Sequence, residues 1–450
     1  MKSNPTASEL LAIVDDARRR TIDLVDDLDD DQRMGPKRDI VNPMLWEIGH
    51  LAWFHERWIL RHLDGRDPLR DDADELYDSI AVHHDDRWSL PLPDYDETRD
   101  YMRGVREALH ERLAGRSATE EEAYYYRYTT FHEDMHAEAF TYTRQTLEYP
   151  RPEFSAAEGG EPTASWGEQS GDVQTRRDVS VPGGTYRLGA PEDAPFAFDN
   201  EREIHEVELE PFEISKTPVT NEQFVRFVED GGYDTREYWS DAGWAWRGET
   251  GAEAPRYWEK RDGTWHRRLF RDWYELQPDA PVVHVSWWEA KAWCRWADRR
   301  LPTEAEWEAA AAGRSAEEAG FADQKVRYPW GDRRREGRPA NLDGRALLEG
   351  ASGDERCLAP VGAFPEGESA FGCRQMLGNV WEWTETTFEP YPGFEPDMYE
   401  DYSAPWFGDR KVLRGGAWAT RSRMVHNYWR NYFTPERRDV YAGFRTCPNG

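Results

Sequence analysis

The segment FHEDMH, residues 131–136, matches the pattern H-E-x-x-H and places two histidines, His132 and His136, four residues apart. Residues with this spacing lie on one face of a helix, about one turn apart, so both imidazoles can reach a single metal ion. Zinc peptidases use the pattern with its glutamate as general base. Because imidazole also suits other divalent metals, the pattern predicts a metal site without naming the ion.

A peptidase of this kind needs a third ligand, either a histidine in the continuation H-E-x-x-H-x-x-G-x-x-H or a glutamate farther along the chain. After His136 the sequence reads AEAFTYTRQTLEY, which lacks the histidine form. Glu148 follows within reach in sequence, but it falls near the end of the same helix. The residues therefore favour a metal site other than a peptidase site. In the remaining interpretation, both histidines are only hydrogen-bonded inside a polar bundle.

Four segments in the first 150 residues predict the helices that would position these side chains. Their apolar residues recur at helical spacing, and the second opens with Asn42 as a cap and Pro43 at the first helical position. The fourth opens with a capping box, in which Ser117 caps and Glu120 reaches back. The predicted helices are 8–28, 43–63, 95–113 and 117–147. Together they predict a four-helix bundle, whose interior is a common place for a metal site.

A chain of 450 residues is too long for one ordinary hydrophobic core, so we expect two domains. The helical part covers 1–150, and a polar segment rich in Gly and Glu, 151–178, predicts a linker. Residues 179–450 change to short alternating strands, glycine turns and tryptophan, which predicts an irregular α+β domain. Further capping boxes in that half begin at Thr220, Ser286 and Thr303. The predicted fold class of the whole chain is α+β.

The formal net charge of −31 comes from 88 acidic and 57 basic residues. It opposes long-range attraction to nucleic acid or to an anionic membrane, so we expect neither as a partner. Only 7 of the basic residues are Lys, and strong acidity with scarce Lys is typical of a halophilic protein. The sequence has no run of about 20 apolar residues and no secretory h-region, which predicts a cytoplasmic protein. Its 4 Cys lack C-x-x-C spacing, which argues against a disulfide scaffold and a zinc ribbon.

Seven motifs follow one another between Val181 and Arg445: VPGGTYRLG, KTPVTNEQFVRFV, RLPTEAEWEAAA, YPWGD, LGNVWEWT, VLRGGAW and AGFR. In this order they resemble the sulfatase-modifying-factor domain, and the resemblance implies a C-type-lectin-like fold. The formylglycine-generating members of that family carry a pair of Cys before the final Pro-containing loop. The matching segment here, SRMVHNYWRNYFTPERR at 422–438, has no Cys, so copper-thiolate chemistry of that type is not expected.

A helical DinB-like domain followed by this lectin-like domain resembles the sulfoxide synthases of the ergothioneine pathway, including the selenoneine synthase branch. The resemblance covers nearly the whole chain and implies O2-dependent joining of sulfur, or selenium, to the imidazole C2 of hercynine, a trimethylated histidine. It also implies an Fe(II) cofactor held by His50, from WEIGHLAWF, together with His132 and His136. Three neutral imidazoles suit a divalent transition metal and leave coordination positions open for O2 and a thiolate. Other nearby polar residues are interpreted as structural, in the case of Glu133, or solvated, in the case of His55 and the His83–His84 pair.

Three positions depart from the best-known members of that family. Met135 stands where they have Gln, and Phe433 stands where they have an Asp that helps to bind the donor. They also hold the carboxylates of γ-glutamylcysteine with an arginine-rich segment, whereas DSIAVHHDDRWSLPLPDYDE here has Arg87 as its only basic residue. Each lost charge-assisted hydrogen bond is worth roughly 1.5–3 kcal/mol. With Arg87, Met135 and Phe433 as predicted substrate contacts, we expect free cysteine or a selenium compound as donor in place of γ-glutamylcysteine.

Aromatic side chains near the C-terminus are the predicted contacts to hercynine. A quaternary ammonium is attracted to ring faces by cation–π interaction. Trp429, Tyr432 and Phe433 offer such faces, beside Asn431 as a polar contact. Packing in a tryptophan-rich core is the alternative explanation for Trp429 and Phe433.

The resemblance also implies a tyrosine near the iron, which donates a proton and steers O2 away from simple thiol oxidation. Tyr399 and Tyr402 are the candidates, because they lie between LGNVWEWT and VLRGGAW as the family's tyrosine does. Other functions stay open on sequence alone. They are a sulfoxide synthase that uses γ-glutamylcysteine or acts on histidine, as in ovothiol synthesis, a non-catalytic binding protein, and a zinc peptidase.

Overall fold

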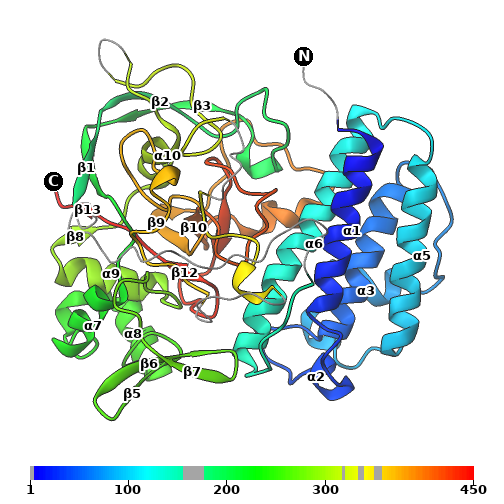
Figure 1. The fold of residues 1–450 in the computed structure, drawn as a ribbon, viewed down its shortest axis with the longest axis horizontal. Coiled ribbons are helices and arrows are strands. Elements are labelled where there is room, and N and C mark those ends of the chain that lie inside the picture. Colours follow the sequence, from blue (N-terminus) through cyan, green and yellow to red (C-terminus); the bar gives the residue numbers. More distant parts are fainter. Residues whose placement is uncertain (1–4, 156–176, 317–319, 333–338, 349–356) are drawn as a thin grey trace. The chain divides into compact units, whose positions relative to one another are not determined.

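The computed structural model describes residues 5–155, 177–316, 320–332, 339–348 and 357–450 (Figure 1). The chain divides into two compact units, of which the first comprises residues 1–162 with 347–350 and the second comprises 163–346 with 351–450. Most of the segment 151–178, predicted as a linker, lies outside the described residues. The architecture is the predicted one, a helical unit followed by a unit of mixed helices and short strands.

The first unit is built from long helices that pack side by side (Figure 1). Its long helices are α1 (Ala7–Asp23), α3 (Met44–His55), α5 (Tyr95–Leu113) and α6 (Glu120–Thr146). Its short helical segments are α2 (Asp30–Met34), the π-helix η1 (Glu56–Arg61), α4 (Ala73–Tyr77) and the 3-10 turn η2 (His84–Asp86). Helix α6 packs on α1 and α3, and α5 packs on α3 and α1, so the interior of the bundle is enclosed by all four long helices.

Two predicted helix starts are wrong in their capping residues. Helix α6 is capped by Thr119 and Glu122 in a complete capping box, and Ser117 is exposed outside it. Both serine and threonine fit the S/T-x-x-E pattern, and the choice is made by Arg116, whose two terminal nitrogens lie 2.8 and 2.7 Å from the Glu122 oxygens. At α3, the cap position is Pro43, and Asn42 instead donates to Glu47 Oε1 at 3.1 Å.

The second unit contains five small sheets and four short helices among its described residues. Its longer strands and helices are β1 (Asp178–Val181), β2 (Gly184–Leu188), β3 (His205–Leu209), β4 (Phe212–Ser215), α7 (Asn221–Glu229), α8 (Asp241–Thr250), β5 (Trp258–Arg261), β6 (Thr264–Leu269), β7 (Asp272–Glu275), α9 (Trp287–Trp296), α10 (Glu304–Ala312), β9 (Trp381–Thr387), β10 (Lys411–Arg414) and β11 (Asn431–Phe433). The shortest strands and 3-10 turns are η4 (Asp199–Glu201), η5 (Arg236–Tyr238), β8 (Arg299–Arg300), η6 (Arg345–Leu347), η7 (Pro365–Gly367), η8 (Glu400–Tyr402), η9 (Ala404–Trp406), β12 (Ala442–Gly443) and β13 (Cys447–Pro448).

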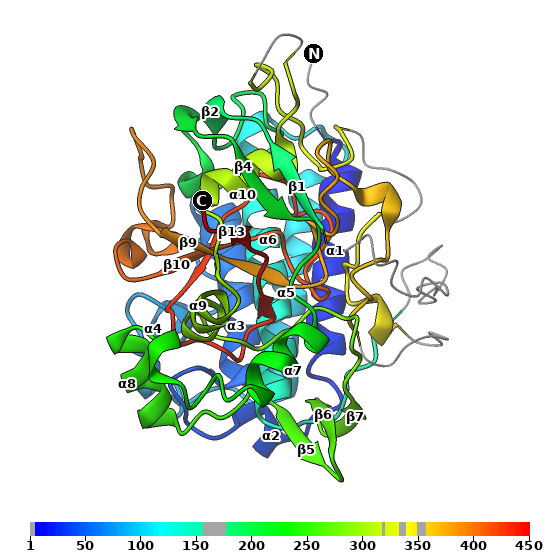
Figure 2. The same ribbon diagram turned by 90° about the vertical axis from the view of Figure 1, so that its left-hand side faces the viewer.

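The largest sheet of the second unit among the described residues has four strands in the order β11-β10-β9-β12. Its paired strands β9 and β10 are labelled in Figure 2. The other sheets are the pairs β1-β4, β2-β3 and β13-β8 and the antiparallel three-stranded β5-β6-β7. Tryptophan and paired charges fill the core beside the four-stranded sheet. Arg445 Nε lies 2.6 Å from Glu382, and the Trp307 indole donates to the same carboxylate at 2.7 Å. The capping boxes predicted at Thr220, Ser286 and Thr303 are all present.

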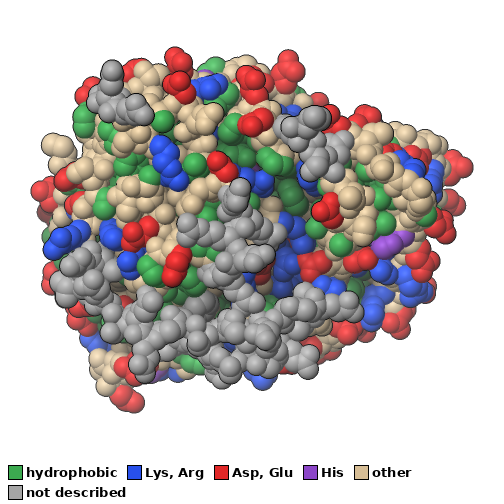
Figure 3. Space-filling model, turned by 45° about the horizontal axis from the view of Figure 1, so that its top comes forward, with side chains coloured by type: hydrophobic (Ala, Val, Ile, Leu, Met, Phe, Trp, Pro, Cys, Tyr) green, Lys and Arg blue, Asp and Glu red, His purple; other side chains and the backbone are tan. Residues whose placement is uncertain are grey.

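The surface carries charged side chains of both signs. Figure 3 shows one face on which Asp and Glu side chains are scattered among Lys and Arg. Of the helices in the described part of the chain, none combines the length and apolarity needed to span a membrane. All four cysteines are buried, and the described residues contain no disulfide between them.

Replacing the two candidate caps of α6 tests the corrected helix start. Thr119→Ala is expected to destabilise the protein by about 1 kcal/mol, because it leaves the backbone N–H of Glu122 without its acceptor. Ser117→Ala is the matched control and is expected to be neutral, because its side chain caps nothing in the structure. Urea unfolding followed by circular dichroism measures both. A larger loss for Ser117→Ala would contradict this helix start.

Candidate metal centre

Three histidines converge inside the first unit. His50 comes from α3, and His132 and His136 come from successive turns of α6. Each contributes one ring nitrogen to a group whose atoms all lie within 4.8 Å of one another. The ring centroids are 5.1 Å apart for His50 and His132 and 4.6 Å apart for His132 and His136. The structure thus brings together all three predicted ligands, although His50 is some eighty positions distant in sequence.

Each imidazole also has a contact outside this group. His50 Nδ1 lies 2.8 Å from the Tyr77 carbonyl oxygen, which leaves Nε2 for the cluster. The His132 ring stacks on Phe54 with centroids 3.8 Å apart. His136 Nδ1 lies 3.4 Å from Glu47 Oε1. Such contacts orient metal-ligating imidazoles, and at His50 the Tyr77 contact also leaves Nε2 as the ligand nitrogen.

Burial determines the charge state of two of the three histidines. Desolvation, reinforced by the neighbouring histidines, lowers the pKa of both His50 and His132 well below the usual value. Both rings are therefore neutral at pH 7 and present lone pairs, the form in which imidazole binds a metal. Nitrogen ligands of this type fit a divalent transition metal, whereas Mg²⁺ and Ca²⁺ prefer oxygen.

The glutamate of the H-E-x-x-H pattern is already engaged on the other side of α6. Glu133 Oε1 accepts from Arg18 Nε at 3.0 Å and from the Thr21 hydroxyl at 2.7 Å. Its Oε2 accepts from Arg18 Nη2 at 3.1 Å and lies 3.0 Å from His55 Nε2. Burial opposes the charged form, but Arg18, His55 and Thr21 together lower the pKa of Glu133 to about 2. These contacts give Glu133 a structural role. Because its carboxylate is engaged by them, Glu133 is not available as the general base that a peptidase of this pattern requires.

The interpretation of His55 as solvated is wrong. Its side chain is fully buried and contacts Glu133, because the last turn of α3 faces α6. His83 is exposed, and the part-buried His84 reaches the carbonyl oxygen of Val41 at 2.9 Å. None of these three histidines joins the cluster.

Arg87 is anchored within the first unit. Its Nη1 donates to Asn42 Oδ1 at 2.7 Å, and its guanidinium lies 3.9 Å from the centroid of the Trp46 ring. Asn42 in turn donates to Glu47, so a chain of contacts leads from Arg87 to His136. Sequence reasoning missed Asn42 and Glu47. The spacing of Glu47, three residues before His50 and on the same helix face, was the available signal.

Met135 and the remaining predicted site residues are placed as follows. Met135 is half-buried beside His136 in the first unit. The other predicted contacts and both candidate tyrosines belong to the second unit: Tyr399, Tyr402, Trp429, Asn431, Tyr432 and Phe433.

Tyr402, Trp429 and Tyr432 make aromatic contacts in the second unit, whereas Asn431 and Phe433 lie on the other face of β11. Tyr432 stacks on Phe388 with centroids 3.9 Å apart, and Tyr402 lies 6.3 Å from Tyr432. Trp429 is buried against Trp381, with ring centroids 4.8 Å apart. Neighbouring residues of a strand point to opposite faces, so Phe433 faces away from Tyr432.

The centroid of the Phe433 ring instead lies 5.0 Å from Cζ of the Arg437 guanidinium. Asn431, on the same face of β11 as Phe433, accepts from the Tyr432 backbone N–H at 2.8 Å. Tyr399 is half-buried, and it is close enough to Tyr432 to raise the pKa of that phenol together with burial and Asp199.

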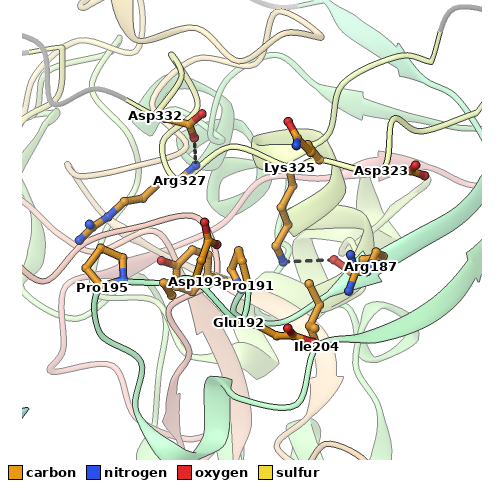
Figure 4. A pocket seen from close by; sticks show the side chains of 13 residues that line it. Arg187, Pro191, Glu192, Asp193, Pro195, Ile204, Asp323, Lys325, Arg327 and Asp332 are labelled. Carbon is orange, nitrogen blue, oxygen red and sulfur yellow. Dashed lines mark hydrogen bonds between the residues drawn. The ribbon is translucent and has the colours of Figure 1, made fainter. Parts of the chain in front are cut away.

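A separate pocket in the second unit has a volume of about 590 Å³ (Figure 4). It has charges of both signs on its walls, including Arg187, Asp193 and Asp332. Lys325, at its base, is already bonded to Glu308 and to the carbonyl oxygen of Arg187. None of the predicted site residues lines this pocket.

Each of the two units matches the model of a known domain family. The model of the DinB superfamily matches residues 13–144, and that of the sulfatase-modifying factor enzyme 1-like domain matches 164–449. A hercynine oxygenase of Mycolicibacterium thermoresistibile is 39% identical over 449 residues, which cover 98% of this chain and 95% of that protein. A hercynine oxygenase of Mycobacterium tuberculosis is 37% identical, covering 95% of this chain and 96% of its own.

The chain belongs to the hercynine oxygenase family.

More distant similarity is limited to part of the chain. A formylglycine-generating enzyme of Streptomyces coelicolor is 35% identical and covers 61% of this chain and 90% of its own. Among solved structures, PvdO from Pseudomonas aeruginosa matches with 25% identity and a TM-score of 0.40, covering 61% of this chain and 94% of its own. The family predicted from the sequence motifs is confirmed by the full-length similarity to hercynine oxygenases and by the two domain models.

Two glycine-to-alanine changes test how tightly the cluster is built. A Cβ on Gly49 would lie 2.3 Å from ring atoms of Tyr77, whose carbonyl holds His50, so Gly49→Ala is expected to destabilise by about 1–3 kcal/mol. Gly104→Ala on α5 meets no atom within 4 Å and is expected to stabilise by up to about 1 kcal/mol. Thermal unfolding measures both. Equal effects would contradict close packing of Tyr77 on α3.

Proposed function

We infer that this protein is a metal-dependent oxygenase that joins sulfur, or selenium, from a small donor to the imidazole C2 of hercynine. The observation that carries the proposal is the convergence of His50, His132 and His136, of which the first two are buried and neutral. It occurs in a chain that is similar along nearly its whole length to hercynine oxygenases. A binding protein of the same fold would have no need for three converging imidazoles.

The metal is proposed to be iron(II), held by these three histidines. Three protein ligands would leave part of the coordination sphere of such an ion open to small molecules, and the bound metal would supply the activation of O2 and of the donor thiol. The surrounding residues orient the imidazoles through Tyr77, Phe54 and Glu47. The charge of Glu47 also favours a cation at this place.

The overall reaction balances with O2 as the only oxidant. The C2–H of hercynine and the S–H of a thiol donor are lost, and a C–S bond forms. One oxygen atom of O2 is retained in the sulfoxide, and the other leaves as water with the two hydrogens. The four electrons that reduce O2 come from C–S bond formation and from oxidation of the sulfur.

The aromatic group of the second unit is proposed to receive hercynine. Tyr432 and Trp429 are proposed to present ring surface to the trimethylammonium group. Asn431, on the opposite face of β11, is proposed as a separate polar contact. Tyr399 or Tyr402 is proposed as the proton donor. Burial raises the pKa of Tyr402 well above its usual value, which supports a phenol that is protonated at neutral pH.

The donor is proposed to be free cysteine or a selenium compound. Arg87 supports this proposal because its guanidinium is hydrogen-bonded to Asn42 and stacked on Trp46. These contacts compete with binding of a γ-glutamylcysteine carboxylate. Phe433 offers no charge to an amino-acid donor. The second candidate, γ-glutamylcysteine, is favoured by the full-length similarity to named hercynine oxygenases.

Metal analysis tests the proposed ligands. Protein prepared without oxygen is expected to contain about one iron per chain, and His132→Ala is expected to contain none. His83→Ala is the control, because this exposed histidine lies outside the cluster, and it is expected to keep the iron. Retention of stoichiometric zinc with full activity would contradict an iron site.

Product analysis tests the reaction and the donor together. Incubation of the iron-loaded protein with hercynine, O2 and cysteine, a selenosugar or γ-glutamylcysteine is read by mass spectrometry. We expect kcat/KM for γ-glutamylcysteine to be lower by roughly a hundredfold, the value of two lost carboxylate contacts. Phe433→Asp is expected to improve its use, with Phe433→Leu as control. Absence of any hercynine product would contradict the function, and a wide preference for γ-glutamylcysteine would contradict the donor.

A further inference from the structure

A buried acidic turn lies beside the proposed hercynine site in the second unit. This turn, η4, consists of Asp199, Asn200 and Glu201, each at most 1% exposed. Three polar side chains in a row are rarely buried unless each has partners or a function. Asn200 Oδ1 and Glu201 Oε1 have no hydrogen-bond partner among the described residues. This combination is more typical of a functional site than of a stabilising core.

The Asp199 carboxylate contacts the loop that carries both candidate tyrosines. Its Oδ1 accepts from the Ser403 hydroxyl at 2.5 Å, and its Oδ2 accepts from the Asp397 backbone N–H at 3.2 Å. Asn200 Nδ2 donates to the same Ser403 oxygen at 2.8 Å. One carboxylate thus fixes the segment 397–403 at both of its ends, with Tyr399 and Tyr402 between them.

The same turn is connected to the aromatic group on β11. Arg430, which precedes Asn431, donates to the Asn200 carbonyl oxygen at 2.7 Å. The Phe198 ring stacks on Tyr402 with centroids 4.5 Å apart. The turn therefore sets the position of the tyrosines relative to the strand that bears Tyr432.

The loop needs such an anchor because of its length. Residues 388–410 join β9 to β10, and hydrogen bonds between Phe388 and Arg410 and from Gly408 to Phe388 close only its base. Long loops with fixed ends keep many conformations unless side chains hold their interior. An inward contact from a buried carboxylate supplies this restraint in the middle of the loop.

We propose that Asp199 is a positioning residue that holds the 397–403 segment, and with it the proton-donating tyrosine of the proposed function, in the conformation that proton transfer requires. The inference rests on the proposed function, in which that tyrosine directs O2 toward C–S bond formation. When the proton is not delivered, the competing outcome is oxidation of the thiol alone, in which RSH and O2 give RSO2H. The ratio of hercynine product to sulfinic acid therefore reports the position of the tyrosine, separately from the total rate.

The test compares this product ratio among variants of the iron-loaded protein. Asp199→Ala is expected to lower the ratio by about tenfold or more, because small displacements of a reacting group have effects of this size. Ser403→Ala removes one of the two hydrogen bonds between this segment and the Asp199 carboxylate and is expected to lower the ratio less, whereas Ser403→Thr keeps the hydroxyl and is expected to keep the ratio of the parent protein. Asp409→Asn, an exposed change in the same loop, is expected to leave the ratio unchanged.

Two further variants separate this inference from the function on which it rests. Tyr399→Phe and Tyr402→Phe identify the tyrosine that controls the ratio, and one of them is expected to lower it as Asp199→Ala does. If the parent protein forms no hercynine product, the proposed function fails. If it forms product and a tyrosine variant changes the ratio while Asp199→Ala and Ser403→Ala do not, the positioning role is overturned. An unchanged ratio in both tyrosine variants also overturns it. Should Asp199→Ala fail to fold, the Ser403 pair alone decides the question.

Discussion

The carboxylate of Glu133 is the point at which three helices of the first unit meet. It comes from α6 and binds Arg18 and Thr21 of α1 and His55 at the end of α3. A buried carboxylate that lost these partners would be strongly destabilising, so the pairing fixes the rotation of α6 about its axis. Because His132 and His136 lie on the face of α6 that remains, the direction of the two imidazoles follows from where Glu133 is bound.

The pairing of Glu133 also distinguishes this histidine cluster from the site of an H-E-x-x-H peptidase. In an H-E-x-x-H peptidase, the glutamate must be available to a metal-bound water. Here its lone pairs are occupied by an arginine, a hydroxyl and an imidazole on the opposite side of the helix. The charge that does lie near the histidines comes from Glu47 on α3, held in turn by Asn42. The metal site is therefore built by two helices.

In the second unit, buried arginine–glutamate pairs perform a similar role. Arg430 Nε donates to Glu304 Oε1 at 2.7 Å, and its Nη1 donates to the Asn200 carbonyl oxygen. The Arg430 guanidinium also stacks on Tyr391, with Cζ 4.0 Å from the ring centroid. These contacts link α10, the acidic turn and the strand β11, none of which are neighbours in sequence. A lectin-like fold of short strands has few long hydrogen-bonded ladders, so side-chain networks take over the positioning of its loops.

The sequence by itself determined what depends on local spacing or on a full set of motifs. Helical periodicity placed His132 and His136 on one face, the three capping boxes of the second unit were predicted correctly, and the ordered motifs led to the family. Tertiary structure decided the rest. Even a local choice required the folded chain, because Ser117 and Thr119 both fit a capping pattern and the pairing of Arg116 with Glu122, six residues apart, accompanies the cap at Thr119. His55 was buried because its helix turn faces α6, and Arg87 was anchored by Asn42, far away in sequence. Local patterns state which groups a residue can bind, but only the packed fold brings one particular partner within reach and removes the water that would compete with it.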